Sequence, residues 1–263
     1  MIKRPFFCFL LSTFLVVLSF AETRIIAHRG FSSAAPENTL AAFREAIAVG
    51  ADYFELDVHQ SRDGRLIVIH DATVNRVASG GEQGKVADMS LRELRKIRVG
   101  YPRRFEDNFP RERIPTLRRA RRVAKGKISV CVEIKVEGIE EATMKTIRRL
   151  NMEDEVIIFS FHYSVLEKFR ELDADIPLLY LRSVVDSTFI ADAAAIRASA
   201  IGAGRPTKIT AELLQTVHAK GMELWQWTIN DPADMQHLLE VGADGIITDY
   251  PDVALELREK LSR

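Results

Sequence analysis

Eight short apolar runs alternate with longer segments of helical periodicity along most of this 263-residue chain. Short runs rich in β-branched residues are typical of buried strands, and amphipathic segments between them are typical of helices that connect parallel strands. The runs are RIIAH near residue 24, YFELDV near 53, ISVCVEIK near 128, VIIFSF near 156, PLLYL near 177, SAIGAG near 199, MELWQWTI near 222 and DGIITD near 244. Eight βα units in a chain of this size predict an α/β fold, the (β/α)8 TIM barrel, with a doubly wound open sheet as the alternative.

One segment does not follow the alternation. Residues 72–115 are polar, charged and dotted with glycine, and they contain one short helical piece around SLRELRKI. We expect a small insertion after the second strand, beside the mouth of the barrel. The preceding stretch GRLIVIHD indicates an extra hairpin arm that pairs with the second strand through the turn SRDG.

The first residues have the composition of a targeting segment. Lys3 and Arg4 precede an apolar stretch that ends at Phe20, and the small residue Ala21 stands where a signal peptidase cleaves. We predict a signal peptide over residues 1–21, a single barrel domain over residues 22–263, and export to a periplasm or to the medium. A retained anchor is the alternative, but about fifteen apolar residues fall short of the ~20 that span a bilayer.

The charge balance excludes some classes of partner. Lysine and arginine number 37, as do aspartate and glutamate, so the net charge is zero. Such a balance favours neither nucleic acid nor an acidic membrane surface as a partner, and we expect no stable membrane insertion after cleavage. The local exception is RRARRVAKGK, whose charges we expect to spread around the solvated face of a helix. Loss of the signal peptide leaves Cys131 as the only cysteine, which excludes an internal disulfide.

Charged residues interrupt two of the apolar runs. Side chains two apart on a strand share a face, so Glu55 and Asp57 point the same way, as do Glu133 and Lys135. Unpaired charges are expensive to bury inside a barrel. One divalent cation held by three carboxylates, with Lys135 beside them, accounts for all four residues. Buried salt bridges across neighbouring strands are the alternative, against which the three-to-one excess of carboxylates argues.

Two histidines stand at strand ends. His28 ends the first run and His70 ends the hairpin arm, and such ends converge on the catalytic face of a barrel. An imidazole titrates near neutrality, so one histidine can take a proton while the other gives one. Arg29 can clamp phosphoryl oxygens with both prongs of its guanidinium, and Lys135 can stabilise charge in the transition state. Together with a metal ion this set suits a phosphate ester, and the sequence has no motif for an organic cofactor.

Seven motifs occur in a fixed order between about Arg24 and Asp252: AHRG, PENT, GADYFELDV, DGRLIVIHD, EIK, WTIN and ADGIITDYP. In this order they resemble the glycerophosphodiester phosphodiesterase family of PI-PLC-like phosphodiesterase barrels. The resemblance implies a (β/α)8 barrel with a small insertion after the second strand. It also implies hydrolysis of small-molecule glycerophosphodiesters, such as glycerophosphocholine or glycerophosphoethanolamine, to glycerol 3-phosphate and an alcohol.

The same resemblance implies roles for individual residues. Glu55, Asp57 and Glu133 would bind one calcium or magnesium ion, His28 and His70 would be the general acid and base, and Arg29 and Lys135 would contact phosphate. Asn38 of PENT would shape the substrate pocket, and Phe161 and Trp227 would line its mouth. For Trp227 the alternative is packing in the barrel core.

Two other functions remain open from the sequence. The same chemistry could act on lipid substrates, as in a lysophospholipase D or a sphingomyelinase-type phosphodiesterase. A lipid enzyme should present an apolar rim, whereas the insertion is mainly charged, with Tyr101, Phe105 and Phe109 as its candidate exposed aromatic residues. The third function is that of a non-catalytic phosphate-ester binding protein, against which the complete set of chemical residues argues.

Overall fold

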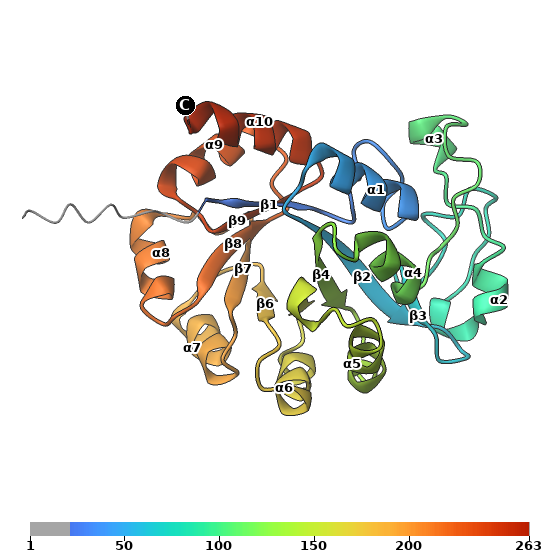
Figure 1. Ribbon diagram of the computed structural model, residues 1–263, viewed down its shortest axis with the longest axis horizontal. Helices are drawn as coiled ribbons and strands as arrows, with labels where there is room; N and C mark the ends of the chain where they lie inside the picture. The colour runs from blue at the N-terminus through green and yellow to red at the C-terminus, as the bar shows by residue number, and fades with distance from the viewer. Residues whose placement is uncertain (1–21, 263) are drawn as a thin grey trace, which may run out of the picture.

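Eight parallel strands close into a ring in this computed structural model, which describes residues 22–262 (Figure 1). They are β1 (Arg24–Ala27), β2 (Tyr53–Gln60), β4 (Ser129–Ile134), β5 (Val156–Ser160), β6 (Leu178–Arg182), β7 (Ala200–Gly204), β8 (Glu223–Trp227) and β9 (Gly245–Thr248). Strand β1 pairs in parallel with both β2 and β9, which closes the ring. The predicted (β/α)8 barrel is confirmed, and the open sheet is excluded because β1 has a neighbour on each side. The predicted signal peptide lies outside the described residues.

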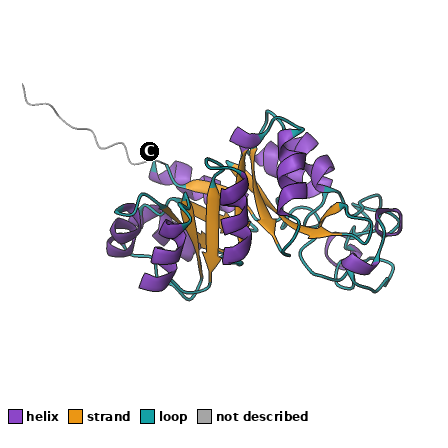
Figure 2. Cartoon of the chain, turned by 90° about the horizontal axis from the view of Figure 1, so that it is seen from below, coloured by secondary structure: helices purple, strands orange, loops and turns teal. Residues whose placement is uncertain are grey.

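Helices cover the outside of the ring (Figures 1 and 2). They are α1 (Leu40–Val49), α4 (Leu117–Ala124), α5 (Glu140–Arg148), α6 (Tyr163–Leu172), α7 (Ser187–Ala195), α8 (Ala211–His218), α9 (Pro232–Val241) and α10 (Pro251–Leu261). The sequence GAD occurs twice because two of these helices end alike: Gly50 and Gly242 take the left-handed conformation that closes a helix. In the part of the chain that the structure describes, no helix is long and apolar enough to cross a membrane.

The segment between β2 and α4 leaves the barrel as a separate lobe, at the right of Figure 1. Strand β3 (Leu66–Val68) pairs antiparallel with β2, which confirms the hairpin. Beyond it come the 3-10 turn η1 (Val86–Asp88), the short helix α2 (Leu91–Leu94) inside the predicted helical piece, and α3 (Pro102–Phe105), which we did not predict. This polar lobe folds around a small core of its own, formed by Ile67, Ile69, Val74, Val86, Leu94, Ile97, Val99 and Ile114.

The barrel interior is filled by apolar side chains. Its buried members are Ile26, Cys131, Phe159, Leu179, Leu181, Ala200, Trp225 and Ile247. Trp225 is fully buried and packs edge-on against Phe159, with ring centroids 5.7 Å apart. A glycine makes room for it, since a Cβ at Gly245 would lie 2.6 Å from the Trp225 ring. Charged side chains are therefore confined to the two ends of the interior.

The arginine-rich helix α4 departs from the prediction of a fully solvated charged face. Arg121 is completely buried and donates to the carbonyl of Met152 at 3.1 Å, while two of its nitrogens have no hydrogen-bond partner within residues 22–262. The reason is helical spacing, because position 121 falls on the same buried stripe as Leu117, Ala120 and Ala124. Burial lowers the pKa of Arg121 to about 10, although nearby glutamates oppose the shift.

Candidate active site

Three carboxylates meet at the carboxyl ends of two neighbouring strands. Glu55 and Asp57 lie on β2, and Asp57 is directly opposite Glu133 on β4 in the parallel register. One oxygen from each lies within 4.8 Å of the others, and all three residues are at least nine-tenths buried. The alternation inferred from the sequence therefore brings the three predicted ligands together.

The surrounding contacts satisfy most of the carboxylate oxygens. Asp57 accepts from the Asn38 amide at 2.7 Å and lies 3.4 Å from the Lys135 ammonium, which also donates to Glu133 at 2.5 Å. The backbone N–H of Arg29 donates to Oε2 of Glu55 at 2.9 Å. Oε1 of Glu55 is buried and has no hydrogen-bond partner among residues 22–262.

Burial and mutual repulsion shift the acidity of this cluster. Burial, together with the charges of Asp57 and Glu133, raises the pKa of Glu55 well above its usual value. Burial and the charge of Asp57 also raise the pKa of Glu133 to about 7. For Asp57, the positive charges of Arg29 and Lys135 outweigh burial and lower the pKa. A cluster of oxygen donors with an unpartnered buried oxygen could hold a metal ion, and the residues present fit one.

Two histidines stand beside the carboxylates, each anchored by an aspartate. Nδ1 of His28 lies 2.7 Å from Asp249, which directly follows β9. Nδ1 of His70 lies 2.6 Å from Asp71, the next residue in the chain. Because each Nδ1 is engaged, the Nε2 atom of each ring is the one left for a ligand.

The aspartate partners have perturbed acidity. Burial would raise the pKa of Asp249, but hydrogen bonds from His28, Asn230 and Ser32 hold it well below its usual value. Burial is also the largest influence on His70 and lowers its pKa, although the charge of Asp57 opposes the shift. Asp249 therefore stays a carboxylate, which can steady a proton on the His28 ring.

Arg29 is bound more tightly than the sequence suggested. The chain turns at this residue with a φ of 56°, so its backbone N–H reaches Glu55 while its side chain runs to Glu37 at 3.0 Å. Its Nε lies 3.5 Å from Asp57. Glu37 thus takes one donor of the guanidinium that we predicted to clamp phosphate, and Asp57 faces another, while Arg29 lines both cavities described below.

A small cavity of about 120 Å³ joins these groups. It is lined by His28, Arg29, Glu55, His70, Glu133, Lys135, Phe159, Phe161, Leu181, Trp227, Thr228 and Ile247. A wider cavity of about 510 Å³ lies next to it and shares His28, Arg29, Trp227 and Thr228.

The two predicted aromatic residues lie at the mouth of the small cavity. Trp227 packs edge-on against Phe161 with ring centroids 5.2 Å apart, and the tryptophan that fills the core is Trp225 instead. Asn38 is buried behind Asp57 and lines neither of the two cavities, so its contact with the site is through that carboxylate.

Comparison with known proteins identifies the family to which a chain with this site belongs. The model of the glycerophosphoryl diester phosphodiesterase family matches residues 28–253. The chain belongs to this family. A glycerophosphodiester phosphodiesterase of Caldanaerobacter subterraneus subsp. tengcongensis is 38% identical over 249 residues, which cover 91% of this chain and 99% of the relative. Because the family consists of phosphoric diester hydrolases, the enzyme class predicted from the sequence is confirmed.

Solved structures of glycerophosphodiester phosphodiesterases and related enzymes share the fold. A phosphodiesterase of Oleispira antarctica, solved with the product sn-glycerol-3-phosphate, has a TM-score of 0.81 and 26% identity, covering 90% of this chain and 97% of that one. A glycerophosphodiester phosphodiesterase of Agrobacterium tumefaciens has a TM-score of 0.77 and 28% identity, covering 89% and 99%.

Sequence reasoning missed a set of residues that tie the site of this glycerophosphodiester phosphodiesterase family member together. Arg76 in the insertion donates to Asp71 at 2.8 Å and to Glu37 at 2.7 Å, so it links the partner of His70 to the partner of Arg29. A signal for Asp71 was present, because it follows His70 directly in DGRLIVIHD. No local pattern relates Arg76 to residues so distant in the chain.

Proposed function

We propose that this chain hydrolyses glycerophosphodiesters, such as glycerophosphocholine and glycerophosphoethanolamine, to glycerol 3-phosphate and an alcohol. The observation that carries the proposal is a pair of aspartate-anchored histidines, His28 and His70, lining one cavity with the carboxylates of Glu55 and Glu133. The Oleispira antarctica relative holds sn-glycerol-3-phosphate as its product, which supports this substrate class.

In the proposed reaction the two Nε2 atoms transfer the protons. One imidazole takes the proton of the attacking hydroxyl, which belongs to water or to the glycerol of the substrate. Attack by water gives glycerol 3-phosphate directly, whereas attack by the glycerol hydroxyl gives a cyclic phosphate that a water molecule then opens. The other imidazole gives its proton to the departing alcohol oxygen as the phosphorus–oxygen bond breaks. Asp249 and Asp71 keep both rings oriented and stabilise their protonated forms.

We further propose that Glu55, Asp57 and Glu133 hold one divalent cation, calcium or magnesium. The donors are all carboxylate oxygens, which these hard cations prefer, and the unpartnered Oε1 of Glu55 supports the assignment. Such a cation, when bound, stabilises negative charge on the phosphoryl oxygens. Lys135, beside Asp57 and Glu133, adds a second positive charge for the phosphate.

The leaving alcohol is proposed to occupy the wider cavity. The inner cavity of about 120 Å³ has room for little more than a glycerol phosphate, whereas the outer one of about 510 Å³ opens beside His28. Arg104 and Arg205 line the outer cavity together with Glu37 and Asp249, so its lining carries both signs of charge and suits a polar alcohol.

Release of glycerol 3-phosphate from a panel of glycerophosphodiesters tests the proposal. We expect turnover with calcium or magnesium and none with chelator. His28→Asn and His70→Asn should each lower turnover by about 10²–10⁴-fold, the contribution of a general acid or base. His218→Asn is a matched control, because His218 also pairs with an aspartate, Asp244, but lies on α8 outside the barrel. Full activity in either active-site variant would refute the assigned roles.

A second candidate function is hydrolysis of lysophospholipids. Among the described residues, Phe161, Val184 and Tyr250 are large apolar or aromatic side chains left exposed, and they follow β5, β6 and β9 at the mouth end of the barrel. By contrast, the aromatic residues of the insertion pack together, with the Phe105 and Phe109 centroids 5.5 Å apart. Faster turnover of lysophosphatidylcholine than of glycerophosphocholine would favour this candidate over the first.

We also propose that residues 1–21 direct export, with cleavage after Ala21. The basic start and the apolar stretch of this segment support the proposal. N-terminal sequencing of the protein recovered from the periplasm or the medium should begin at Glu22. Recovery of the chain with Met1 intact in the membrane fraction would contradict it.

A further inference from the structure

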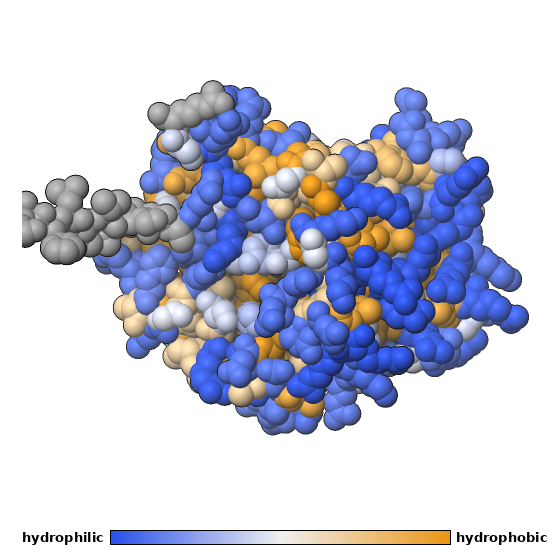
Figure 3. All heavy atoms as spheres, in the orientation of Figure 1, coloured by the Kyte–Doolittle hydropathy of each residue, from blue (hydrophilic) through white to orange (hydrophobic). Residues whose placement is uncertain are grey.

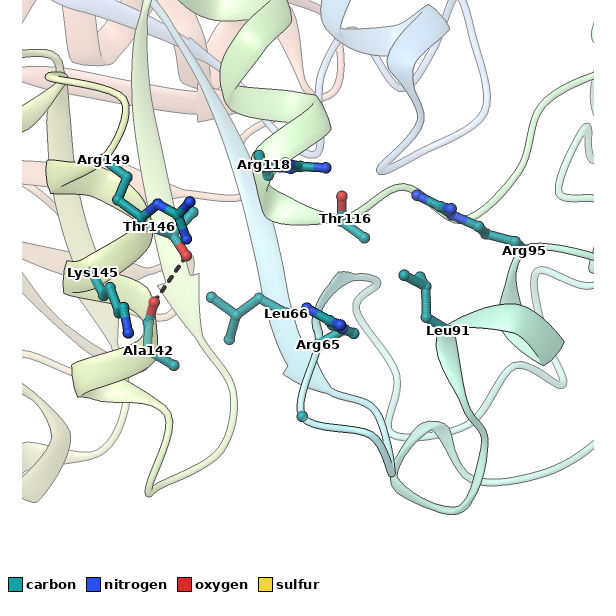
Figure 4. A pocket seen from close by; sticks show the side chains of 11 residues that line it. Arg65, Leu66, Leu91, Arg95, Thr116, Arg118, Ala142, Lys145, Thr146 and Arg149 are labelled. Carbon is teal, nitrogen blue, oxygen red and sulfur yellow. Dashed lines mark hydrogen bonds between the residues drawn. The ribbon is translucent and has the colours of Figure 1, made fainter.

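A second cleft lies on the outer flank of the barrel, away from the catalytic cavities. It has a volume of about 540 Å³ and lies between the β2–β3 hairpin, α2, the start of α4 and helix α5 (Figure 4). Its lining residues are Gly64, Arg65, Leu66, Leu91, Arg95, Thr116, Arg118, Ala142, Lys145, Thr146 and Arg149. None of them lines either catalytic cavity.

The lining of this cleft carries one sign of charge. Five of its residues are cations, contributed by the hairpin, α4, α5 and the residues just after α2 and α5, and none is an acid. Strongly hydrophilic side chains gather over α4 and α5 on the face seen in Figure 3. A concave surface lined by one sign of charge focuses the electric field and concentrates counter-ions of the opposite sign.

The cations of the cleft form no ion pair within the part of the chain that the structure describes. Within residues 22–262, Arg65, Arg95, Arg118, Lys145 and Arg149 make no ion pair and no side-chain hydrogen bond, and the bond drawn in Figure 4 joins Thr146 to Ala142. The nearby carboxylates make their hydrogen bonds to other groups, although the charge of Asp63 acts on Arg65 from outside the lining. Asp63 accepts from Ser61 and from the Leu91 backbone, and Glu93 accepts from Ser90 and Arg62.

The first turn of α4 adds to the positive potential. Its N-cap residue Thr116 makes no capping hydrogen bond, and the turn holds Arg118 where an acidic residue would compensate the helix dipole. Figure 4 shows Arg118 and Arg95 pointing toward one another beside the Thr116 hydroxyl. A hydroxyl and two guanidinium groups thus lie together at this opening.

We propose that this cleft binds an anion that carries two or more phosphate groups. Four of the five cations are arginines, whose planar guanidinium groups match phosphate oxygens two at a time, and a singly charged anion would leave most of them uncompensated. No aromatic side chain lines the cleft, so it lacks the stacking platforms of single-stranded nucleic-acid sites. The phosphates come either from a soluble oligophosphate or from clustered headgroups of anionic lipid.

Binding of two probes without added divalent cation tests the site. The first probe is inorganic tripolyphosphate, whose binding is measured by calorimetry. The second probe is a pair of vesicle preparations. One contains phosphatidylcholine alone, and the other contains phosphatidylcholine and phosphatidylglycerol in equal parts. Binding to both is measured by co-sedimentation. The cleft variant is Arg65→Gln, Arg118→Gln and Arg149→Gln combined. The control variant removes as many exposed cations elsewhere: Arg44→Gln, Lys127→Gln and Lys220→Gln.

The cleft variant should lose roughly tenfold or more in affinity while the control variant binds like the wild type. Affinity confined to tripolyphosphate assigns the soluble source, and affinity for the phosphatidylglycerol vesicles alone assigns the lipid source. Equal binding by the wild type and the cleft variant, or no binding of either probe by the wild type, overturns the proposal. Thermal unfolding of both variants, measured alongside, identifies any loss that comes from misfolding.

Discussion

Two groups of charges lie inside the same barrel, one at each end of the apolar interior. At the amino ends of the strands, Arg24 of β1 pairs with Glu223 of β8, which also accepts the indole N–H of Trp225 at 2.8 Å. At the carboxyl ends, Glu55, Asp57 and Glu133 of β2 and β4 outnumber the cations that touch them.

The difference between these two ends separates structure from function. At the amino ends of the strands, the positive charge of Arg24 is balanced by the negative charge of Glu223, so this pair needs no bound cation. The carboxylate cluster has surplus negative charge, and a buried oxygen of Glu55 has no hydrogen-bond partner among the residues that the structure describes. Ion pairs occur at both ends, but at the carboxyl ends three carboxylates face Arg29 and Lys135, so salt bridges alone, the alternative considered from the sequence, leave negative charge uncompensated there.

The largest expected effect is on turnover in Glu55→Gln. The substitution removes one carboxylate of the cluster, so we expect glycerophosphodiester hydrolysis to fall by on the order of 10²–10³-fold. The free energy of unfolding in chelator should not fall, because a repelling, buried negative charge is gone. Steady-state kinetics and urea denaturation measure both quantities. Activity within a few-fold of the wild type would refute the role of Glu55.

Addition of calcium or magnesium should stabilise the folded chain. A ligand that binds only the native state adds about 2.7 kcal/mol at a concentration of about 100 times Kd. Thermal unfolding with and without cation should show this gain in the wild type and a smaller one in Glu133→Gln. The variant Glu223→Gln, at the amino ends of the strands, serves as control and should keep the full gain. An equal gain in Glu133→Gln would place the cation elsewhere.

Removal of the carboxylate beside His28 should impair catalysis without removing a catalytic residue. In Asp249→Asn the imidazole loses the partner that fixes its tautomer, so we expect kcat to fall by about 10–100-fold. KM should change little, and the pH profile of kcat should shift, which a merely structural defect would not produce. An unchanged pH profile would argue that Asp249 only supports the loop after β9.

A substitution at the amino ends of the strands should have the opposite effect, lowering stability and leaving turnover unchanged. Glu223→Gln weakens the pair with Arg24 and should cost about 0.5–1 kcal/mol of stability, because both side chains are partly exposed. Turnover should stay at the wild-type level. Urea denaturation measures the first quantity and the standard assay the second, and a large loss of turnover would abolish the contrast between the two ends.

The smallest effect concerns acid stability. The pKa of Asp249 is lowered in the folded chain, so its stabilising contribution is complete above the unfolded-state value of about 3.9 and declines as pH falls toward the folded-state value. The stability difference between the wild type and Asp249→Asn should therefore be largest near neutrality and narrow below about pH 4. Urea midpoints at several pH values would test this, and a constant difference would contradict it.

The fold could be predicted from the sequence because its signals are local. Each of the eight apolar runs became a barrel strand, and the alternation along β2 placed Glu55 and Asp57 on one face. The burial of Arg121 was also encoded locally, by its spacing from Leu117 and Ala124, but its charge concealed the pattern. The short helix α3 has four residues, too few for a periodicity to show.

The contacts that orient the site could not be predicted because they join distant segments. Asp249 reaches His28 across 221 positions of sequence, and Arg76 reaches Glu37 across 39. Such pairs form only when the ring closes between β1 and β9 and when the insertion folds back on the mouth. The contact of Arg29 with Asp57 also joins separate segments, whereas Glu37 lies only eight residues from Arg29, and both contacts limit the phosphate clamp that the sequence suggested.

Cys131 lies on β4 two residues before Glu133, fully buried in the apolar interior, and burial raises the pKa of its thiol. It is the one cysteine of residues 22–262. A thiol-reactive dye can reach Cys131 only when the ring of strands opens, so the rate of labelling measures the rate of barrel opening. Labelling of Cys131 should therefore become slower when a cation binds to the carboxylates of Glu55, Asp57 and Glu133.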